Sequence, residues 1–356
     1  MDADWREALL ERGARLDGDA VVSFGAPDAE ARAAETGTVI CDLSHLGVIR
    51  FEGEDAETFL QGQVTCDVRE IRQGAVRYGG YNTPQGRLLA TFLIWHAEGA
   101  FHVQLPAAMR EAVAKRLQMF VLRSKVRIAD ATRDAVRIGL GGPGAAALAA
   151  AAGVTATGPR AHAGVDGALW LPLEGKRWEM VVPSAGATAG WDALVAAGAA
   201  PAGANPWDWT EVRAGVPVVV PDTRDQFVPQ MANLDLVGGI SFSKGCYTGQ
   251  EIVARTQYLG RLKRRMYVAH VDVAADTDPQ PRPGDPVFDD RIPGQACGMV
   301  AGAARAPDGG SDLLIVMQIA SRDSPAVRWK SVDGPALRFL ELPYAVPALQ
   351  APPDRR

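Results

Sequence analysis

The sequence contains little cysteine, and the cysteines that it has lie far apart. Its 356 residues include only Cys41, Cys66, Cys246 and Cys297. No two of them form a C-x-x-C pair, so a local zinc or iron–sulfur ligand set is not indicated. Their low density also argues against the disulfide framework of a secreted domain. The pattern predicts a protein of a reducing compartment.

Long apolar runs and targeting patterns are lacking as well. No run approaches the roughly 18 apolar residues that a membrane span requires. The first residues, MDADWREALLERGARL, are acidic and amphipathic, unlike a signal peptide. No Walker A motif is present, which disfavours nucleotide binding of the P-loop type. We therefore expect a cytoplasmic protein with no membrane partner.

The composition is that of a globular protein without a dominant charge. Hydrophobic residues make up 47% of the chain and charged residues 22%. The net charge of −5 gives no overall attraction to nucleic acid, so any polyanion site must be a local patch. At about 100–200 residues per domain, the length predicts two or three domains.

Three regions of the chain differ in their sequence patterns, and together they predict an α+β fold. Residues 1–129 mix helices with antiparallel hairpins and lack a steady β-α-β alternation. Residues 130–205 form a second unit rich in Ala and Gly, after which residues 206–260 return to the first domain. Short strands between Pro/Gly turns at 261–346 indicate a small barrel or sandwich, and the Pro-rich tail at 347–356 is expected to fray.

The stretch with the most reactive chemistry is SFSKGCYTGQEIVARTQY, at residues 241–258. Glycines on both sides of the cysteine allow a partner to approach closely, and a nearby cation can stabilise the reactive thiolate. We therefore predict a functional thiol, with a buried structural cysteine as the alternative. The candidate site residues of this stretch are Cys246, Lys244, Glu251 and Arg255.

A base for this thiol is not evident near it in the sequence. His45, in a Gly/Ser turn, is the best candidate among the histidines, but only folding could bring it close to Cys246. A Cys-His hydrolase is therefore weakly indicated. The other three cysteines lie in apolar or small-residue contexts and are expected to fill the core.

Basic residues gather immediately after the thiol. Residues 244–265 carry six basic side chains against one glutamate, in a chain whose net charge is −5. Arg261, Lys263 and Arg265 alternate, so a strand would place them on one face. Such a patch suits phosphate or carboxylate ligands, with tRNA as the natural candidate, whereas a solvated strand face is the alternative.

The stretch around the thiol resembles a known family. Residues 226–255, QFVPQMANLDLVGGISFSKGCYTGQEIVAR, are similar to the YgfZ-type folate-binding proteins, relatives of mitochondrial iron–sulfur assembly factors. The core K-G-C-Y-T-G-Q-E at 244–251 is the specific part of the match. Weaker similarity occurs at residues 53–68, 81–95, 122–128 and 212–217.

The resemblance implies a fold and a ligand. The fold would have two ferredoxin-like α+β domains and a C-terminal β-barrel around a central channel. The ligand would be tetrahydrofolate or a one-carbon derivative, and the partners would be iron–sulfur enzymes such as tRNA methylthiolases. The family's thiol falls on Cys246, and its folate-lining positions fall on Trp207 and near Leu46. On its own, Trp207 could stack on a flat heterocycle or anchor the core.

Departures from the related glycine cleavage T-proteins bear on activity. Residues 87–91 contain no carboxylate where T-proteins carry a catalytic one. Arg213 stands where T-proteins carry a glutamate and Glu211 lies nearby, so the resemblance makes both of them further candidate folate-binding residues. These departures favour a folate-binding accessory protein for iron–sulfur assembly and tRNA methylthiolation over a turnover enzyme. A folate-dependent aminomethyl transferase and a tRNA-binding module using residues 255–265 are the alternatives.

Overall fold

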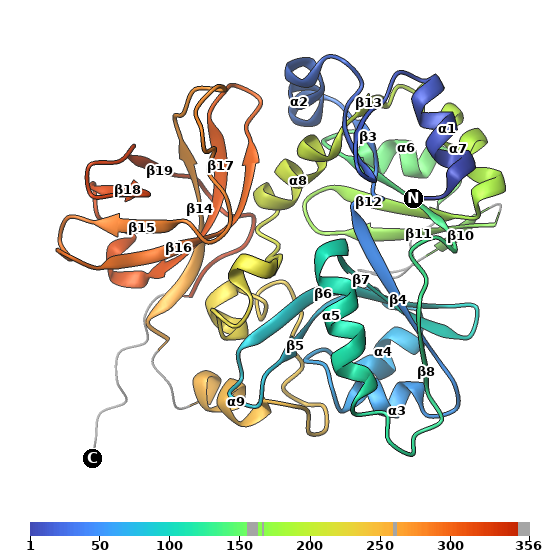
Figure 1. Cartoon of the computed structure of the whole chain (residues 1–356), viewed down its shortest axis with the longest axis horizontal. Coiled ribbons are helices and arrows are strands. Elements are labelled where there is room, and N and C mark those ends of the chain that lie inside the picture. The colour runs from blue at the N-terminus through green and yellow to red at the C-terminus, as the bar shows by residue number, and fades with distance from the viewer. Residues whose placement is uncertain (155–162, 166, 259–261, 348–356) are drawn as a thin grey trace.

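The computed structural model describes residues 1–154, 163–165, 167–258 and 262–347, which build three large sheets and a separate two-stranded hairpin (Figure 1). The expected tail at 347–356 lies almost entirely outside the described residues. The predicted α+β class with a C-terminal barrel is confirmed, since two mixed α/β layers are followed by a six-stranded antiparallel sheet.

The first sheet has the strand order β5-β6-β7-β4-β8, all antiparallel. Helix α5 packs on it through Met109, Val113 and Leu117, the apolar positions whose spacing predicts a helix here. The elements are β4 (Leu46–Glu52), α3 (Ala56–Gln61), α4 (Val68–Arg72), β5 (Arg77–Asn82), β6 (Leu88–Ala97), β7 (Ala100–Pro106), α5 (Ala107–Gln118) and β8 (Arg127–Asp130).

The second sheet has the order β10-β11-β12-β9-β3-β13. Strand β3 comes from the N-terminal part of the chain, and Trp5 and Leu9 of α1 pack into the core of this sheet. The elements are α1 (Ala3–Glu11), α2 (Pro27–Thr36), β3 (Val39–Asp42), β9 (Val136–Gly141), α6 (Ala145–Ala151), β10 (Ala163–Val165), β11 (Ala168–Leu173), β12 (Arg177–Val182), α7 (Ser184–Ala196), β13 (Ala200–Ala202) and α8 (Ala204–Arg213).

This arrangement corrects one expected boundary. Residues 1–42 were expected in the first domain with the rest of 1–129, yet β3 is hydrogen-bonded between β9 and β13 of the second sheet. The N-terminal segment also forms the separate hairpin of β1 (Arg15–Asp17) and β2 (Ala20–Ser23). Non-local strand pairing of this kind leaves no local signal in the sequence.

The third sheet has the order β18-β15-β16-β17-β14-β19, and a bridge between Arg328 and Ala336 joins its two edges. This near-closure protects edge strands that would otherwise be exposed. The strands are β14 (Arg264–Val271), β15 (Pro286–Asp289), β16 (Ala296–Arg305), β17 (Ser311–Gln318), β18 (Val327–Trp329) and β19 (Leu337–Phe339). Short 3-10 turns occur at η1 (Pro221–Thr223), η2 (Pro229–Ala232) and η3 (Ile319–Ser321).

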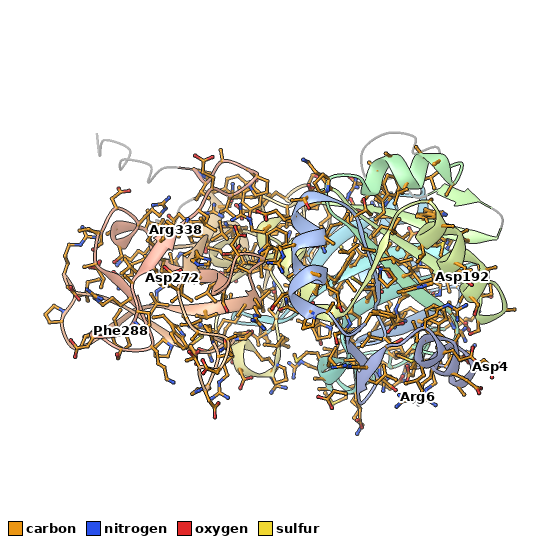
Figure 2. The ribbon with its side chains drawn as sticks, turned by 90° about the horizontal axis from the view of Figure 1, so that it is seen from above. Asp4, Arg6, Asp192, Asp272, Phe288 and Arg338 are labelled. Carbon is orange, nitrogen blue, oxygen red and sulfur yellow. The ribbon has the colours of Figure 1, made fainter. Side chains whose placement is uncertain are left out.

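Helix α8 lies between the second sheet and the barrel. It contacts β3 and β9 of the second sheet on one side and β16 and β17 of the barrel on the other. Figure 2 shows the barrel, with Asp272, Phe288 and Arg338, at one end of the molecule and Asp4, Arg6 and Asp192 at the other. The chain after α8 leads to the first sheet and then to α9 (Gln250–Tyr258), which lies near β5 in Figure 1.

Candidate functional site

A cavity of about 210 Å³ lies where the three parts of the molecule meet. The first sheet contributes Leu46 and Pro106, α8 contributes Glu211, and the barrel contributes Ala301 and Leu314. A smaller hollow of about 50 Å³ adjoins it, since it shares Leu46, Pro106 and Glu211 as lining residues. The walls are largely apolar, so the few polar groups would orient a ligand.

Glu211 is the carboxylate that both hollows share. Its Oε1 lies 3.2 Å from Nη1 of Arg177, a fully buried guanidinium that also donates to the Tyr78 hydroxyl at 3.2 Å. Burial raises the pKa of Glu211, and the positive charge of Arg177 opposes that rise. The ion pair with Arg177 therefore holds the partly exposed Glu211 carboxylate beside the cavity, where its remaining lone pairs can accept hydrogen bonds from a ligand.

A second buried carboxylate lies behind this pair. Glu179 accepts a hydrogen bond of 2.8 Å from Nε2 of Gln104, which links β12 to β7 across the two α+β layers. Burial raises the pKa of Glu179 to about 7, although the hydrogen bond and the nearby Arg137 and Arg177 act in the opposite direction. Protonation here is thus poised close to neutral pH.

His45 also lines the cavity. Its Nε2 lies 3.6 Å from Oδ1 of Asp208, which is beyond hydrogen-bond length, so the contact is electrostatic. Burial lowers the pKa of His45, but the charge of Asp208, with Asp42 and Glu211, outweighs it and the pKa is raised. His45 faces these carboxylates, and the structure shows no contact between it and Cys246 among the described residues.

Two of the expected folate-lining residues do not reach this cavity. Trp207 is only 2% exposed, and its ring is covered by Arg177 at 5.0 Å and by the backbone of Gly139. Its expected role as a stacking surface is therefore wrong for this conformation, and the core-anchor alternative holds. Arg213 points to the other side of α8, 3.8 Å from Asp312. Leu46 and Glu211 are the pair that the fold brings together.

The cysteine stretch forms a loop anchored to the first sheet, which we call the thiol loop (residues 239–249). Lys244 is buried, and its Nζ donates to the backbone oxygens of Val64 and Cys66 at 2.7 Å each. Burial lowers the pKa of Lys244 to about 8. The ammonium also lies 5.2 Å from the ring of Tyr247. The expected role of Lys244 as a cation serving Cys246 is thus replaced by an anchoring role.

Between the buried side chains of Lys244 and Tyr247, the chain turns outward. Cys246 is exposed, as is Gly245, whereas Lys244 and Tyr247 on either side are buried. The alternative of a buried structural cysteine is therefore wrong. The other three cysteines are buried, and burial raises the pKa of Cys66 to about 11. A thiol that is exposed on an anchored loop can meet a macromolecular partner.

Close glycine contacts fix the end of the loop. Gly249 has a φ of +79°, and a Cβ there would lie 2.5 Å from the backbone oxygen of Thr83. The partner glycine, Gly86, has a φ of +71° and would meet Ile252 of α9. The N-T-P-Q-G hairpin at 82–86 thus forms the seat of the thiol loop, a role that the sequence did not indicate.

The basic patch differs from the expected one. Arg265 is buried and forms a two-pronged ion pair with Asp235, with bonds of 2.7 and 2.9 Å. Its expected place on an exposed strand face beside Lys263 is wrong, because β14 begins only at Arg264. Lys263 and Arg264 are exposed, as are Arg255 and Glu251 on α9. Arg261 lies outside the described residues.

A glycine-rich run spans the end of β9 and the turn before α6. G-L-G-G-P-G at 139–144 has the spacing of a dinucleotide-binding fingerprint. However, β9 is antiparallel to both of its neighbours, β12 and β3. A Cβ at Gly139 would lie 2.6 Å from the Trp207 ring, and one at Gly142 would lie 2.4 Å from the Gly37 oxygen. The run serves close packing.

The described residues contain neither a metal-binding cluster nor a helix suited to span a membrane. No three His, Cys, Asp or Glu side chains in the described part of the chain lie in a metal-binding arrangement. Within the same residues, every helix is too short or too polar to cross a bilayer.

Comparisons with known proteins agree with this architecture. A model of the GCVT N-terminal domain matches residues 19–158. The solved structure of the glycine cleavage system aminomethyltransferase T from Bartonella henselae superposes with a TM-score of 0.77, covering 96% of this chain and 97% of that one. At 19% identity, that similarity concerns the fold alone.

Two relatives are similar over nearly their whole lengths. The tRNA-modifying protein YgfZ of Colwellia psychrerythraea is 30% identical over 315 residues, which cover 87% of this chain and 94% of the relative. The tRNA-modifying protein YgfZ of Klebsiella pneumoniae is 29% identical over 327 residues, covering 90% and 96%. The resemblance of the K-G-C-Y-T-G-Q-E stretch is therefore confirmed, and the chain belongs to the YgfZ family.

Proposed function

We propose that this protein binds tetrahydrofolate, or a one-carbon derivative, in the interdomain cavity and supports tRNA modification by iron–sulfur enzymes. The observation that carries the proposal is the apolar cavity in which Glu211 is held by the buried Arg177. A carboxylate with free lone pairs accepts hydrogen bonds from the ring N–H and amino groups of a pterin. The relatives' names, tRNA-modifying protein YgfZ, give the cellular context.

The size of the cavity limits which part of the ligand it holds. At about 210 Å³ it is smaller than a site for a drug-sized molecule, which is about 300–1,000 Å³. It therefore suits the bicyclic ring of a folate rather than the entire molecule. Leu46 and Leu314 would contact the ring faces, in the place that Trp207 was expected to fill.

The exposed thiol of Cys246 is proposed to act on the client enzyme rather than on the folate. The loop that presents it is anchored on the first sheet, and the thiol itself has no hydrogen bond within the described residues. A single cysteine cannot hold a cluster, so a cluster contact would use the client's remaining ligands. This arrangement favours an accessory protein over the aminomethyl transferase alternative, because the segment after the 82–86 hairpin begins with Arg87 and offers no carboxylate.

Calorimetric titration with tetrahydrofolate under anaerobic conditions tests the ligand. We expect Glu211→Gln to weaken binding by about tenfold, since a charge-assisted hydrogen bond contributes about 1.5–3 kcal/mol. Glu251→Gln is the matched control, because it makes the same change at an exposed carboxylate of α9 that does not line the cavity. Equal affinity of wild type and Glu211→Gln would remove the folate assignment.

The thiol role is tested in a strain that lacks the endogenous protein. Mass spectrometry of digested tRNA measures methylthiolated nucleosides in cells that carry wild type or Cys246→Ser. We expect the Cys246→Ser cells to lose most of this modification, while Cys297→Ser, a buried cysteine of the barrel, retains it. Full modification with Cys246→Ser would contradict the role of the thiol.

Direct contact with tRNA is a second candidate, favoured by one surface. Arg255, Lys263 and Arg264 are exposed in the same part of the chain as Tyr258, an aromatic side chain that is 68% exposed. Cations beside an exposed ring suit a phosphate backbone and a stacked base. We expect tRNA binding at low salt to weaken in the double variant Arg255→Glu/Lys263→Glu. If wild type does not bind tRNA at low salt, this candidate fails.

A further inference from the structure

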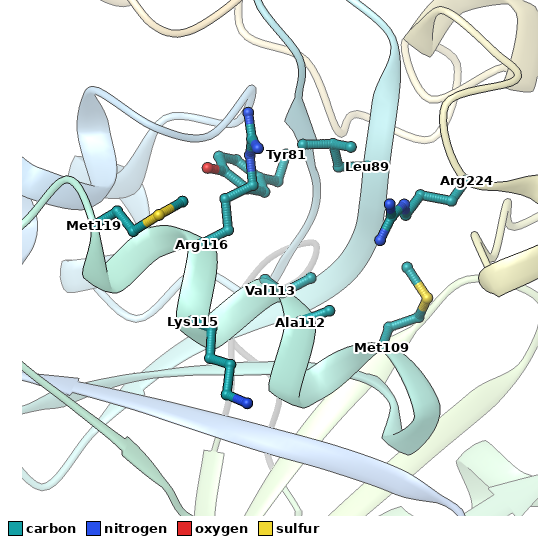
Figure 3. A pocket seen from close by; sticks show the side chains of 9 residues that line it. All are labelled: Tyr81, Leu89, Met109, Ala112, Val113, Lys115, Arg116, Met119 and Arg224. Atoms are coloured by element: carbon teal, nitrogen blue, oxygen red, sulfur yellow. The ribbon is translucent and has the colours of Figure 1, made fainter.

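A separate hollow of about 260 Å³ lies on the first sheet, away from the cavity described above (Figure 3). Helix α5 forms one side through Met109 and Val113, together with Met119 directly after the helix, and the sheet forms the other side through Tyr81 and Leu89. None of its lining residues is shared with the interdomain cavity. The floor is apolar, because Val113, Met109, Leu89 and Tyr81 are all buried core residues.

The rim of this hollow is cationic. Its charged lining residues are Lys115, Arg116 and Arg224, and no carboxylate lines it. Lys115 is neutralised by Glu111 at 2.5 Å, and in Figure 3 it leaves α5 on the side opposite Arg116. Arg116 and Arg224 have no ion pair among the described residues, and Figure 3 shows both beside the hollow. Two cations thus remain without a counter-ion.

Arg116 in particular is an unusual rim residue. It is only partly exposed, and its Nε is buried without a hydrogen-bond partner in the described part of the structure. Burial raises the pKa of the neighbouring Tyr81 hydroxyl, and the charge of Arg116 together with its side-chain hydrogen bond to Tyr81 opposes that rise. A buried donor that lacks an acceptor costs free energy, and an anionic ligand would supply the acceptor.

We propose that this hollow binds a small organic acid, with its apolar body between α5 and the sheet and its anionic head between Arg116 and Arg224. The apolar floor alone would accept a hydrocarbon, and the two arginines alone would attract any anion. Both features occur in one hollow, so a ligand that combines them is favoured. A volume slightly below that of a drug-sized site selects a single ring or a short chain.

The exposed residues that follow α5 agree with a ligand-accepting edge. Met119 is 63% exposed and Leu122 is 87% exposed, and Phe120 between them is also exposed. Leu122 has a φ of +45°, a strained conformation for a branched residue that holds this segment in a tight turn. Of these three residues Met119 lines the hollow, so its side chain would extend the contact made by a ligand's apolar body.

The test uses octanoate as the probe on the full-length protein, labelled with ¹³C at the methionine methyl groups. We expect saturable shifts of the Met109 and Met119 methyl resonances, while those of Met266 and Met317, which are buried in the barrel strands, remain in place. Acetate supplies only the anion and 1-octanol only the apolar chain. We expect each of them to bind at least about tenfold more weakly than octanoate, because each lacks one half of the interaction.

Variants localise and separate the two halves. Arg116→Gln is expected to weaken octanoate binding by about tenfold and to leave 1-octanol binding unchanged. Arg123→Gln, which removes an exposed arginine outside the hollow, is the charge control. Ala112→Trp, at an exposed lining position, is expected to block the hollow, whereas Ala108→Trp on the same helix should not.

Three outcomes overturn the proposal. These are the absence of Met109 and Met119 shifts, equal binding of acetate and octanoate, and octanoate binding that Arg116→Gln and Ala112→Trp leave unchanged. Tetrahydrofolate titration of Ala112→Trp distinguishes this site from the interdomain cavity, because the two share no lining residue. Loss of octanoate binding with intact folate binding supports two independent sites.

Discussion

The thiol loop and the interdomain cavity are built in opposite ways. The loop is one continuous stretch that is fixed to a single sheet by Lys244, Tyr247 and Gly249. The cavity is assembled from the first sheet, α8 and the barrel, with Leu46, Glu211 and Leu314 far apart in the sequence. The first can be altered without moving domains, and the second depends on how three parts are held together.

The thiol loop and the cavity also differ in how their buried charges are satisfied. In the thiol loop the buried charge, Lys244, is satisfied by backbone carbonyls of Val64 and Cys66 and is turned away from the exposed thiol. In the cavity the buried charges face one another, as Arg177 does Glu211. A backbone-satisfied cation positions a loop, whereas a paired carboxylate remains available to a ligand. This difference agrees with the two proposed roles, presentation of a thiol and recognition of a small molecule.

Replacing Gly249 with valine is expected to break the thiol loop and spare the cavity. The left-handed backbone and the close approach to the Thr83 oxygen leave no room for a branched side chain. We expect a loss of about 3 kcal/mol in the free energy of unfolding, measured by urea titration. Gly245→Val is the matched control, since no atom lies within 4 Å of its Cβ position. Equal stability of the two variants would show that the hairpin is not the seat of the loop.

Replacing Asp312 is expected to loosen the cavity and to leave the thiol loop unchanged. Asp312, in β17, accepts from Trp209 of α8 at 2.9 Å and contacts Nδ1 of His270 at 2.8 Å. Asp312→Asn keeps one acceptor and presents a donor where a second acceptor is needed, so we expect a loss of about 2 kcal/mol. Asp272→Asn, an exposed carboxylate that also contacts His270, is the control.

Ligand binding and thiol chemistry report on the two regions separately. In Asp312→Asn we expect weaker tetrahydrofolate binding by calorimetry and an unchanged rate of Cys246 modification by a maleimide. If folate affinity is unchanged while stability falls, the contact between α8 and the barrel does not shape the cavity.

The comparison also explains what could be predicted from the sequence. The K-G-C-Y-T-G-Q-E run is local, so its importance and the α+β class with a barrel could be recognised without a structure. The direction of Lys244 could not, because its carbonyl partners come from residues 64–66, about 180 positions away. Because Lys244 is close to Cys246 in the sequence, it was expected to be a partner of the thiol. In the fold its ammonium instead donates hydrogen bonds to backbone carbonyls.

Burial decided the remaining differences. Arg265 alternates with Lys263 in the sequence, yet the carboxylate of Asp235 makes its burial favourable. Trp207 lies on the expected helix, but Gly139 leaves space for its ring inside the core, so it cannot face a ligand. Strand β3 joins the second sheet through pairing with β9, a contact of high sequence separation. Local patterns do not contain such partners.

Lys244→Met sharpens the view of a backbone-anchored loop. The variant leaves the carbonyls of Val64 and Cys66 without their donor, so we expect a loss of about 1–2 kcal/mol near neutral pH. The folded-state pKa of about 8 lies below the ordinary value of 10.5, so the unfolded chain binds more protons between these pH values. The stability of wild type relative to the variant should therefore rise from pH 8 towards pH 10.5.

Urea titrations at pH 7.5 and pH 10 measure that rise, and Lys263→Met, at an exposed lysine, serves as the control. A relative stability that falls over this interval would mean that the buried ammonium is stabilised in its charged form, contrary to the lowered pKa.

The Glu179→Gln variant tests how the stability of the cavity region depends on pH. Burial holds the Glu179 pKa at about 7, above its ordinary 4.5, so the folded state binds the extra proton between these values. Wild type therefore loses stability as the pH rises from 4.5 through 7, whereas the amide, which still accepts from Gln104, does not. We expect Glu179→Gln to be more stable than wild type by about 2–3 kcal/mol at pH 8 and equal to it at pH 5, since each pKa unit corresponds to about 1.36 kcal/mol. Thermal unfolding at both pH values, with the exposed Glu251→Gln as control, measures the difference. A stability difference that does not change with pH would mean that Arg137 and Arg177 compensate the burial of the Glu179 carboxylate fully.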